Sequence, residues 1–122
     1  MTPRPMTASD RRFVVPTWAR SSTYDGLTLP ERFALVDRIL DELRADVVVL
    51  ATDRTVHVWA AGHAGALDYV YVPPDLRGHG LARRVITALF GHYPERITVT
   101  HEWPRASARF RYAPHLLQRA AA

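Results

Sequence analysis

The chain has 122 residues, which suits one domain with one hydrophobic core, and its 48% hydrophobic and 23% charged residues are typical of a soluble globular protein. It contains no cysteine and no lysine, which excludes disulfides, thiol nucleophiles, cysteine zinc sites, Walker A lysines and Schiff-base lysines. The net charge of +4 would suit an anionic partner, but no run of about five to eight basic residues is present, and arginine usage in a GC-rich genome explains the charge more simply.

No stretch approaches the roughly 20 apolar residues of a membrane span, and residues 1–12 lack the apolar region of a secretory signal. These absences favour a cytoplasmic protein with no membrane partner. We expect residues 1–12 to form a flexible N-terminal arm and residues 13–122 to form a single domain.

The first elements of the domain are a short strand and a helix. Residues 13–22 favour the start of a strand, which Pro16 restricts to a sheet edge or ends early. Residues 28–46 carry the clearest helix pattern, because Thr28 and Glu31 form a capping box ahead of apolar residues at helical spacing.

Three strands are predicted next. Residues 46–53 and 54–62 form two of them, joined by a tight turn near Asp53. Residues 66–72 form the third, which is rich in β-branched and aromatic side chains.

The last part of the chain is expected to add a helix and a strand. The helix over residues 80–91 ends at Gly91, and residues 96–103 return as a strand beside the preceding one through a right-handed crossover. The tail over 105–122 is expected to hold one or two helical turns before Pro114. This order of elements predicts a small α/β or α+β domain.

The junction between the third strand and the second helix has the chemistry of an anion site. A helix N-terminus offers unpaired N–H groups, and Gly78 and Gly80 can aim backbone amides inward without side chains in the way. Arg77, Arg83 and Arg84 add positive potential. The junction fits neither a Walker A loop nor the Rossmann glycine spacing, and an ordinary turn would also use such glycines.

Residues 77–82, Arg-Gly-His-Gly-Leu-Ala, match the Arg/Gln-x-x-Gly-x-Gly/Ala signature of the GCN5-related N-acetyltransferase (GNAT) superfamily, with Arg77, Gly80 and Ala82 at its defining positions. Residues 66–91 also match its strand, turn and helix context. The resemblance implies an α/β (α+β) fold, a GNAT-like mixed sheet with flanking helices, compact and shortened at its C-terminal end. The segments "TWARSS", "YVYV" and "FRYAPHLL" further resemble short acetyltransferase-like proteins of phages and prophages.

The resemblance implies acetyl-CoA as co-substrate and no metal. The strand backbone at Val70 and Val72 would pair with the pantetheine arm, a strand amide near Val70 would stabilise the oxyanion, and the loop amides would hold the pyrophosphate. The residues assigned to the cofactor are Val70, Tyr71, Val72, Arg77, Gly78, His79, Gly80, Leu81, Ala82 and Arg83.

The catalytic candidates are carried over from the same resemblance. Asp68 lies at a strand position where some members place a general base, and Glu102 is the second candidate. Tyr112 lies where the family often has its acid tyrosine, and its reference pKa of about 10 permits proton donation to a thiolate. A solvated strand-start residue or an ion-pair partner of an arginine is the simpler role for Asp68, and Tyr112 could equally be a packing residue beside Phe110.

Other polar and aromatic residues are expected to serve mainly in packing. The histidines show no His-x-x-x-His pair, so scattered positions are favoured over a metal site. His79 could touch the cofactor from within the loop. Trp18 and Tyr24 fall where the family covers the acceptor, although core packing is the simpler role for both.

After the strand over 96–103 only about 19 residues remain, so the acceptor side is expected to be open, reduced or completed by a second copy in a homodimer. We therefore expect an acetyl-CoA-dependent N-acetyltransferase in which an amine attacks the thioester directly. The acceptor is unidentified, with a small amine, a protein amine or a modified nucleobase as candidates. The alternative is a non-catalytic acyl-CoA-binding or nucleic-acid-binding module of the same fold.

Overall fold

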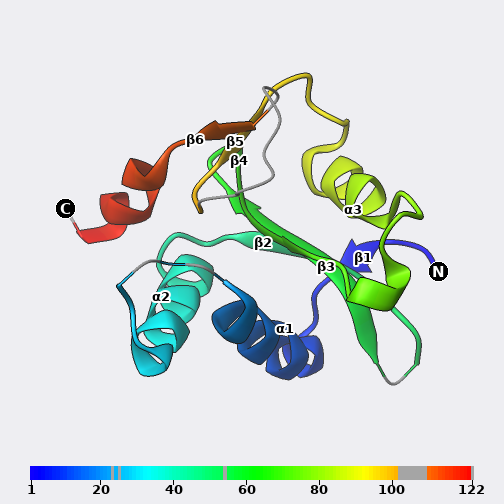
Figure 1. The fold of residues 1–122 in the computed structure, drawn as a ribbon, viewed down its shortest axis with the longest axis horizontal. Helices are drawn as coiled ribbons and strands as arrows, with labels where there is room; N and C mark the ends of the chain where they lie inside the picture. The colour runs from blue at the N-terminus through cyan, green and yellow to red at the C-terminus, as the bar shows by residue number, and fades with distance from the viewer. Residues whose placement is uncertain (23, 25, 54, 102–109, 122) are drawn as a thin grey trace.

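The computed structural model describes residues 1–22, 24, 26–53, 55–101 and 110–121 (Figure 1). The elements in chain order are β1 (Arg4–Pro5), α1 (Ala8–Ser21), α2 (Leu29–Asp41), β2 (Asp46–Ala51), β3 (Val56–His63), β4 (Ala66–Tyr71), the 3₁₀ turn η1 (Pro74–Leu76), α3 (Leu81–Phe90), β5 (Ile97–Val99), β6 (Phe110–Tyr112) and the 3₁₀ helix η2 (Pro114–Ala121). None of the helices over these residues is long and apolar enough to cross a membrane.

The strands form one mixed sheet in the order β1-β2-β3-β4-β5-β6. The pairs from β1 to β4 are antiparallel, whereas β5 runs parallel to both β4 and β6. Helices α1 and α2 cover one face of the sheet and α3 covers the other, as Figure 1 shows. This is the α/β arrangement, a mixed sheet with flanking helices, that the sequence predicted.

Each face of the sheet has its own buried cluster. The cluster under α1 and α2 includes Val14, Trp18, Val36, Ile39, Val49 and Trp59. The cluster under α3 includes Leu50, Val58, Leu67, Val85, Ile86 and Ile97. Because β2 and β3 contribute to both clusters, the centre of the sheet is buried on both faces, which explains the long apolar runs of these strands.

Most predicted elements are confirmed within a few residues. The Thr28 hydroxyl accepts from the Glu31 N–H at 3.3 Å and the Glu31 carboxylate accepts from the Thr28 N–H at 3.1 Å, which is the predicted capping box. Helix α2 is shorter than predicted and ends at Asp41. Gly91 ends α3 with φ of +81°, as expected of a glycine cap.

The strand predicted over residues 13–22 is wrong, because these residues lie in α1. Pro16 lies inside this helix, where a proline costs about 3 kcal/mol. The cost is offset because α1 buries Val14, Val15 and Trp18 against the sheet, and each buried side chain of this size contributes about 1.5–3 kcal/mol.

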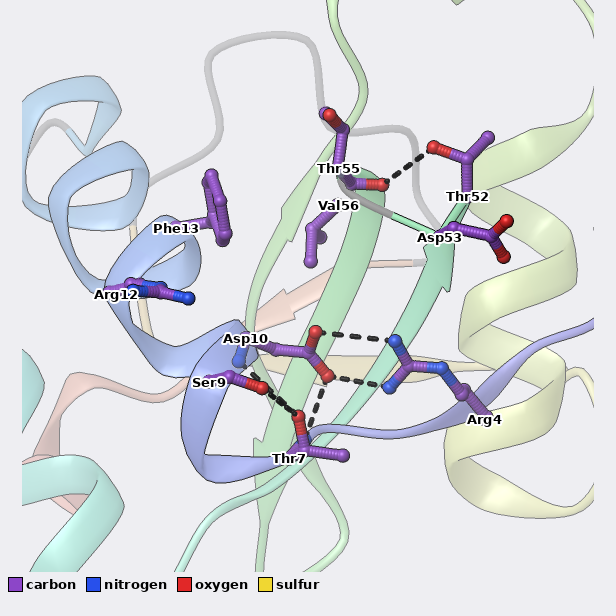
Figure 2. Close-up of a pocket in the computed structure, with 10 residues that line it drawn as sticks. All are labelled: Arg4, Thr7, Ser9, Asp10, Arg12, Phe13, Thr52, Asp53, Thr55 and Val56. Atoms are coloured by element: carbon purple, nitrogen blue, oxygen red, sulfur yellow. Dashed lines mark hydrogen bonds and ion pairs between the residues drawn. The ribbon is translucent and has the colours of Figure 1, made fainter.

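The sequence predicted a flexible arm over residues 1–12, whereas the structure places β1 and the first turn of α1 there. Arg4 donates to both oxygens of the Asp10 carboxylate, at 2.5 and 3.2 Å, and the Thr7 N–H donates to the same carboxylate at 2.8 Å. Figure 2 shows Arg4 reaching Asp10 in a surface pocket beside the β2–β3 turn. The first residues are thus tied to both the sheet and α1.

The prediction for the tail was also wrong in its order. The residues before Pro114 form β6, and the helical turns follow Pro114 in η2. Strand β6 pairs with β5 through Ile97↔Phe110 and Val99↔Tyr112. The remainder of the predicted strand after His101 lies outside the described residues.

Candidate functional site

The pairing between strands β4 and β5 covers only part of β4. They are paired at Ala66↔Thr98 and Leu67↔Val99, and the Thr100 N–H donates to the Leu67 carbonyl at 3.1 Å. Over the described residues the pairing stops there, although β4 continues to Tyr71. The described β4–β5 pairing thus ends just before Asp68, because β5 itself ends at Val99. We call the unpaired stretch of β4 beyond this point the split, and Asp68 its apex.

A β-bulge fixes the backbone at this apex. Ala61 of β3 faces Tyr69, but the next residue, Gly62, faces Leu67, so Asp68 is the extra residue of β4. A side chain at Gly62 would not fit, because its Cβ would lie 2.5 Å from the Ala66 carbonyl oxygen. Bulges of this kind often re-aim a side chain next to an active site.

Asp68 is completely buried and held from two strands. Its Oδ2 lies 2.7 Å from His63 Nδ1, and its Oδ1 accepts a hydrogen bond of 2.7 Å from the Thr100 hydroxyl. The His101 ring also hydrogen-bonds the Asp68 backbone. We call His63, Asp68, Thr100 and His101 the apex cluster. A solvated strand-start residue, one of the two plainer interpretations of Asp68, is thus wrong.

Aromatic rings surround the apex cluster on the face covered by α1 and α2. The rings of Tyr69 and His101 are 4.8 Å apart, and Tyr69 also lies 5.6 Å from Trp59. Trp18 donates its indole N–H to the Tyr24 hydroxyl at 3.2 Å. Trp18 is fully buried, so its role is packing, as the simpler interpretation held.

Burial keeps this aromatic face electrically neutral. It lowers the pKa of His101 to about 4, an effect that the hydrogen bond to the Asp68 backbone partly opposes. It also raises the pKa of Tyr24. At neutral pH both groups are therefore uncharged.

The loop before α3 has the backbone geometry that its glycines predicted. Gly78 and Gly80 have φ of +86° and +72°, in the left-handed region that favours glycine. Gly80 is the N-cap of α3 and supplies no side-chain cap for the first amides of the helix. A Cβ built at either glycine would meet no protein atom within 4 Å, so the space beside both Cα atoms is open.

Arginines flank this open loop. Arg77 donates through Nε to the Val72 carbonyl at 3.1 Å, which ties the loop back to the end of β4. Arg83 lies over the Tyr93 ring at 4.3 Å, and Arg84 donates to the Met1 carbonyl at 2.6 Å. A shallow pocket of about 410 Å³ lies here, lined by Pro3, Gly80, Arg83, Arg84, Thr87 and Ala88.

The other predicted cofactor residues lie along β4 and the start of α3. The half-buried side chains of Val70 and Val72 pack on the α3 face, and that of Tyr71 packs on the opposite face. His79 is exposed, and Leu81 and Ala82 open the helix in half-buried positions. The sequence-predicted residues thus follow one another along β4, the glycine loop and the first turn of α3.

The remaining catalytic candidates are less closely grouped. Tyr112 is 54% exposed in β6 and close enough to Tyr24 to affect its titration. Glu102 lies outside the described residues. Sequence reasoning missed the roles of His63 and Thr100 beside Asp68, although a His and an Asp that flank a short turn in a hairpin are a signal of cross-strand contact.

In the part of the chain that the structure describes, no group of three or more His, Cys, Asp or Glu side chains is arranged to hold a metal ion. Comparison with curated proteins finds no match to the chain. The family model described as the acetyltransferase (GNAT) family matches residues 16–113, a span that includes α2, the split, the glycine loop and α3. The chain therefore belongs to the acetyltransferase (GNAT) family.

Proposed function

We propose that the protein is an acetyl-CoA-dependent N-acetyltransferase that moves an acetyl group to an amine acceptor by direct attack on the thioester. The observation that carries the proposal is that the β4–β5 split and the loop with left-handed backbone at Gly78 and Gly80 follow one another along the chain, both inside the matched family region. A family match alone would also fit a member that has lost its activity. In such a member we would expect the glycine loop to be filled by side chains, or the sheet to be closed between β4 and β5.

The residues present fit this co-substrate. The first amides of α3 carry no side-chain cap, so they can donate to the pyrophosphate, with Arg77 and Arg83 nearby to balance its charge. Beyond Leu67, the β4 backbone has no described partner on its β5 side and can pair with the amide-containing pantetheine arm. Acetyl-CoA supplies the activated acyl group.

Two proton movements accompany the reaction. The attacking amine forms a C–N bond and must lose a proton, while the C–S bond breaks and the thiolate gains one. We assign removal of the amine proton to the Asp68 region, because it is the buried anionic centre at the apex of the split. Tyr112 is the proposed proton donor, since its exposed phenol lies in β6 on the far side of β5.

The acceptor approaches from the face covered by α1 and α2 in this proposal. That face presents the half-buried rings of Tyr69 and Tyr71 beside the split. Flat apolar rings suit an aliphatic amine stem or a base carrying an amine equally, so a protein amine and a modified nucleobase both remain acceptor classes to screen.

The test is acetyl transfer itself. Purified protein would be incubated with acetyl-CoA and, separately, an alkylamine, a lysine-containing peptide and an aminoalkyl-modified nucleoside, with thiol release and product mass as readouts. We expect CoA release that depends on one amine class, together with an acetylated product. Binding of acetyl-CoA without transfer to any amine would contradict the enzymatic proposal and favour a non-catalytic acyl-CoA-binding module.

A further inference from the structure

We propose that the 3′-phosphate of the acyl donor binds in the shallow pocket between α3 and the start of the chain, and that Arg84 is the residue that recognises it. The inference rests on the proposed function and extends it to donor specificity, because it separates acetyl-CoA from a thioester that lacks only this phosphate. Arg84 is then a binding residue for the donor and takes no part in the transfer step.

Two segments of the chain form the pocket. The first is one face of α3, where Gly80, Arg84 and Ala88 follow one another at intervals of four residues, and the backbone N–H of Arg84 donates to the Gly80 carbonyl at 3.2 Å. The second is the segment before β1, where Pro3 lines the pocket and the Met1 carbonyl accepts a hydrogen bond of 2.6 Å from Arg84. Both of these early residues precede the region that the family model matches, so this wall does not follow from family membership.

The charge of the pocket is positive. Arg83 and Arg84 line it, both are exposed, and among the described residues neither forms an ion pair with a carboxylate. Arg83 lies over the Tyr93 ring, and Arg84 donates to a neutral carbonyl. None of the described residues that line the pocket is acidic. Two guanidinium groups around a space of about 410 Å³ therefore favour a small anionic group.

The pocket at the start of α1 has a similar size but a different charge. Its volume is about 510 Å³, and it is lined by Arg4 and Arg12 but also by Asp10 and Asp53. Figure 2 shows that Arg4 is already paired with Asp10 there. Because positive and negative side chains are balanced in that pocket, it does not favour an anion, although it is the larger of the two.

Arg84 has the hydrogen-bonding capacity that a phosphate monoester needs. A guanidinium group carries five N–H donors, and the Met1 carbonyl accepts from one of its nitrogens. The remaining donors can form the paired hydrogen bonds that are typical of arginine and phosphate. The Thr87 hydroxyl, by contrast, already donates to the Arg83 carbonyl at 2.7 Å, so the donors that the pocket offers are the two guanidinium groups.

The place of the pocket along α3 matches the chemistry of the donor. CoA carries the pyrophosphate and the 3′-phosphate on the same ribose, so the two groups must bind close together. Gly80 caps α3 at the amides proposed for the pyrophosphate, and it also lines the pocket. Arg84 lies about one turn, or about 5.4 Å, further along the helix axis. A donor whose pyrophosphate lies at these amides can therefore bring its 3′-phosphate to Arg84.

The experiment compares two ligands by calorimetric titration of the full chain: acetyl-CoA and acetyl-dephospho-CoA, which lacks only the 3′-phosphate. We expect the wild type to bind acetyl-CoA at least about tenfold more tightly, because hydrogen bonds to a charged group are among the stronger ones. In Arg84→Gln this preference should largely disappear. Arg84 is exposed, so the substitution should leave the fold intact, which circular dichroism checks.

Two further variants separate the pocket from the overall charge. Arg96 is an exposed arginine beyond the C-terminal end of α3 and does not line the pocket, so Arg96→Gln removes the same charge and should keep the preference. Ala88 is an exposed helix residue that lines the pocket, and glutamate is a good helix former. Ala88→Glu should therefore lower the affinity for acetyl-CoA more than the affinity for acetyl-dephospho-CoA.

The outcomes distinguish this inference from the proposed function. Equal affinity of the wild type for the two ligands, or a preference that survives Arg84→Gln, would overturn the inference and leave the proposed function intact. An equal loss of preference in Arg84→Gln and Arg96→Gln would indicate a diffuse effect of charge and would also overturn the assignment. A folded wild type that binds neither ligand would contradict the proposed function, and the inference would fail with it.

Discussion

The bond from Thr100 to Asp68 offers the sharpest test of how the split is held. Thr100→Val keeps the β-branched shape but removes the hydroxyl that donates 2.7 Å to a fully buried carboxylate oxygen. A hydrogen bond to a charged group contributes about 1.5–3 kcal/mol, and the Asp68 oxygen left behind has no access to water. For a domain of this size, each kcal/mol changes the melting temperature by roughly 4 °C, so we expect a loss of about 6–12 °C.

The assay is thermal unfolding followed by circular dichroism, confirmed by urea unfolding at 25 °C. Thr98→Val is the matched control, because Thr98 lies in β5 two residues before Thr100 and is only half-buried. Among the described residues the structure records no side-chain hydrogen bond for Thr98. The control should change stability by no more than about 0.5 kcal/mol. Equal losses in the two valine variants would refute the idea that the hydroxyl of Thr100 holds the apex.

Three further predictions concern the surrounding structure. Gly62→Ala should lower stability by about 1–3 kcal/mol in urea unfolding, since its Cβ would lie 2.5 Å from the Ala66 oxygen opposite the bulge. The pKa of His101 is lowered from 6.5 to about 4 in the folded protein, so between pH 6.5 and pH 4 the unfolded chain binds more protons. The free energy of unfolding should therefore drop by about 2–3 kcal/mol as the pH falls from 6.5 to 4. His101→Gln should remove this pH dependence. The pKa of Asp10 is lowered to about 2, mainly by its hydrogen bond from Arg4, so the stabilisation by Asp10 is present above pH 3.8 and is lost as the pH falls towards 2. Asp10→Asn should remove this pH dependence of the free energy of unfolding and should cost about 1 kcal/mol at pH 7.

Features encoded within a few residues could be predicted from the sequence. The capping box of Thr28 and Glu31, the glycine at the end of α3 and the left-handed backbone at Gly78 and Gly80 all depend on local geometry. The arginine and glycine pattern before α3 likewise identified the family that the comparison then showed. Such signals survive without knowledge of the tertiary fold because neighbouring residues supply their hydrogen bonds.

Features that depend on packing were harder to predict. Residues 13–22 were predicted to start a strand, whereas they form α1 despite Pro16, because the helix buries Val14 and Trp18 against the sheet. Asp68 was singled out from the sequence, but its burial depends on a bulge opposite Gly62 and on a hydroxyl 32 residues away, at Thr100. Neither the bulge nor this contact leaves a local pattern, so the partners of Asp68 could be found only in the fold.

The central claim is that the loop before α3 binds acetyl-CoA, and calorimetric titration tests it most directly. Acetyl-CoA would be titrated into the wild type, Gly80→Glu and Gly65→Glu, which introduces the same charge at a turn glycine of similar φ, +76° against +72°, between β3 and β4. We expect binding to the wild type and to Gly65→Glu and a loss of binding in Gly80→Glu, where a carboxylate would occupy the anion site. Binding that survives Gly80→Glu, or a folded wild type that binds no acetyl-CoA, would contradict the account.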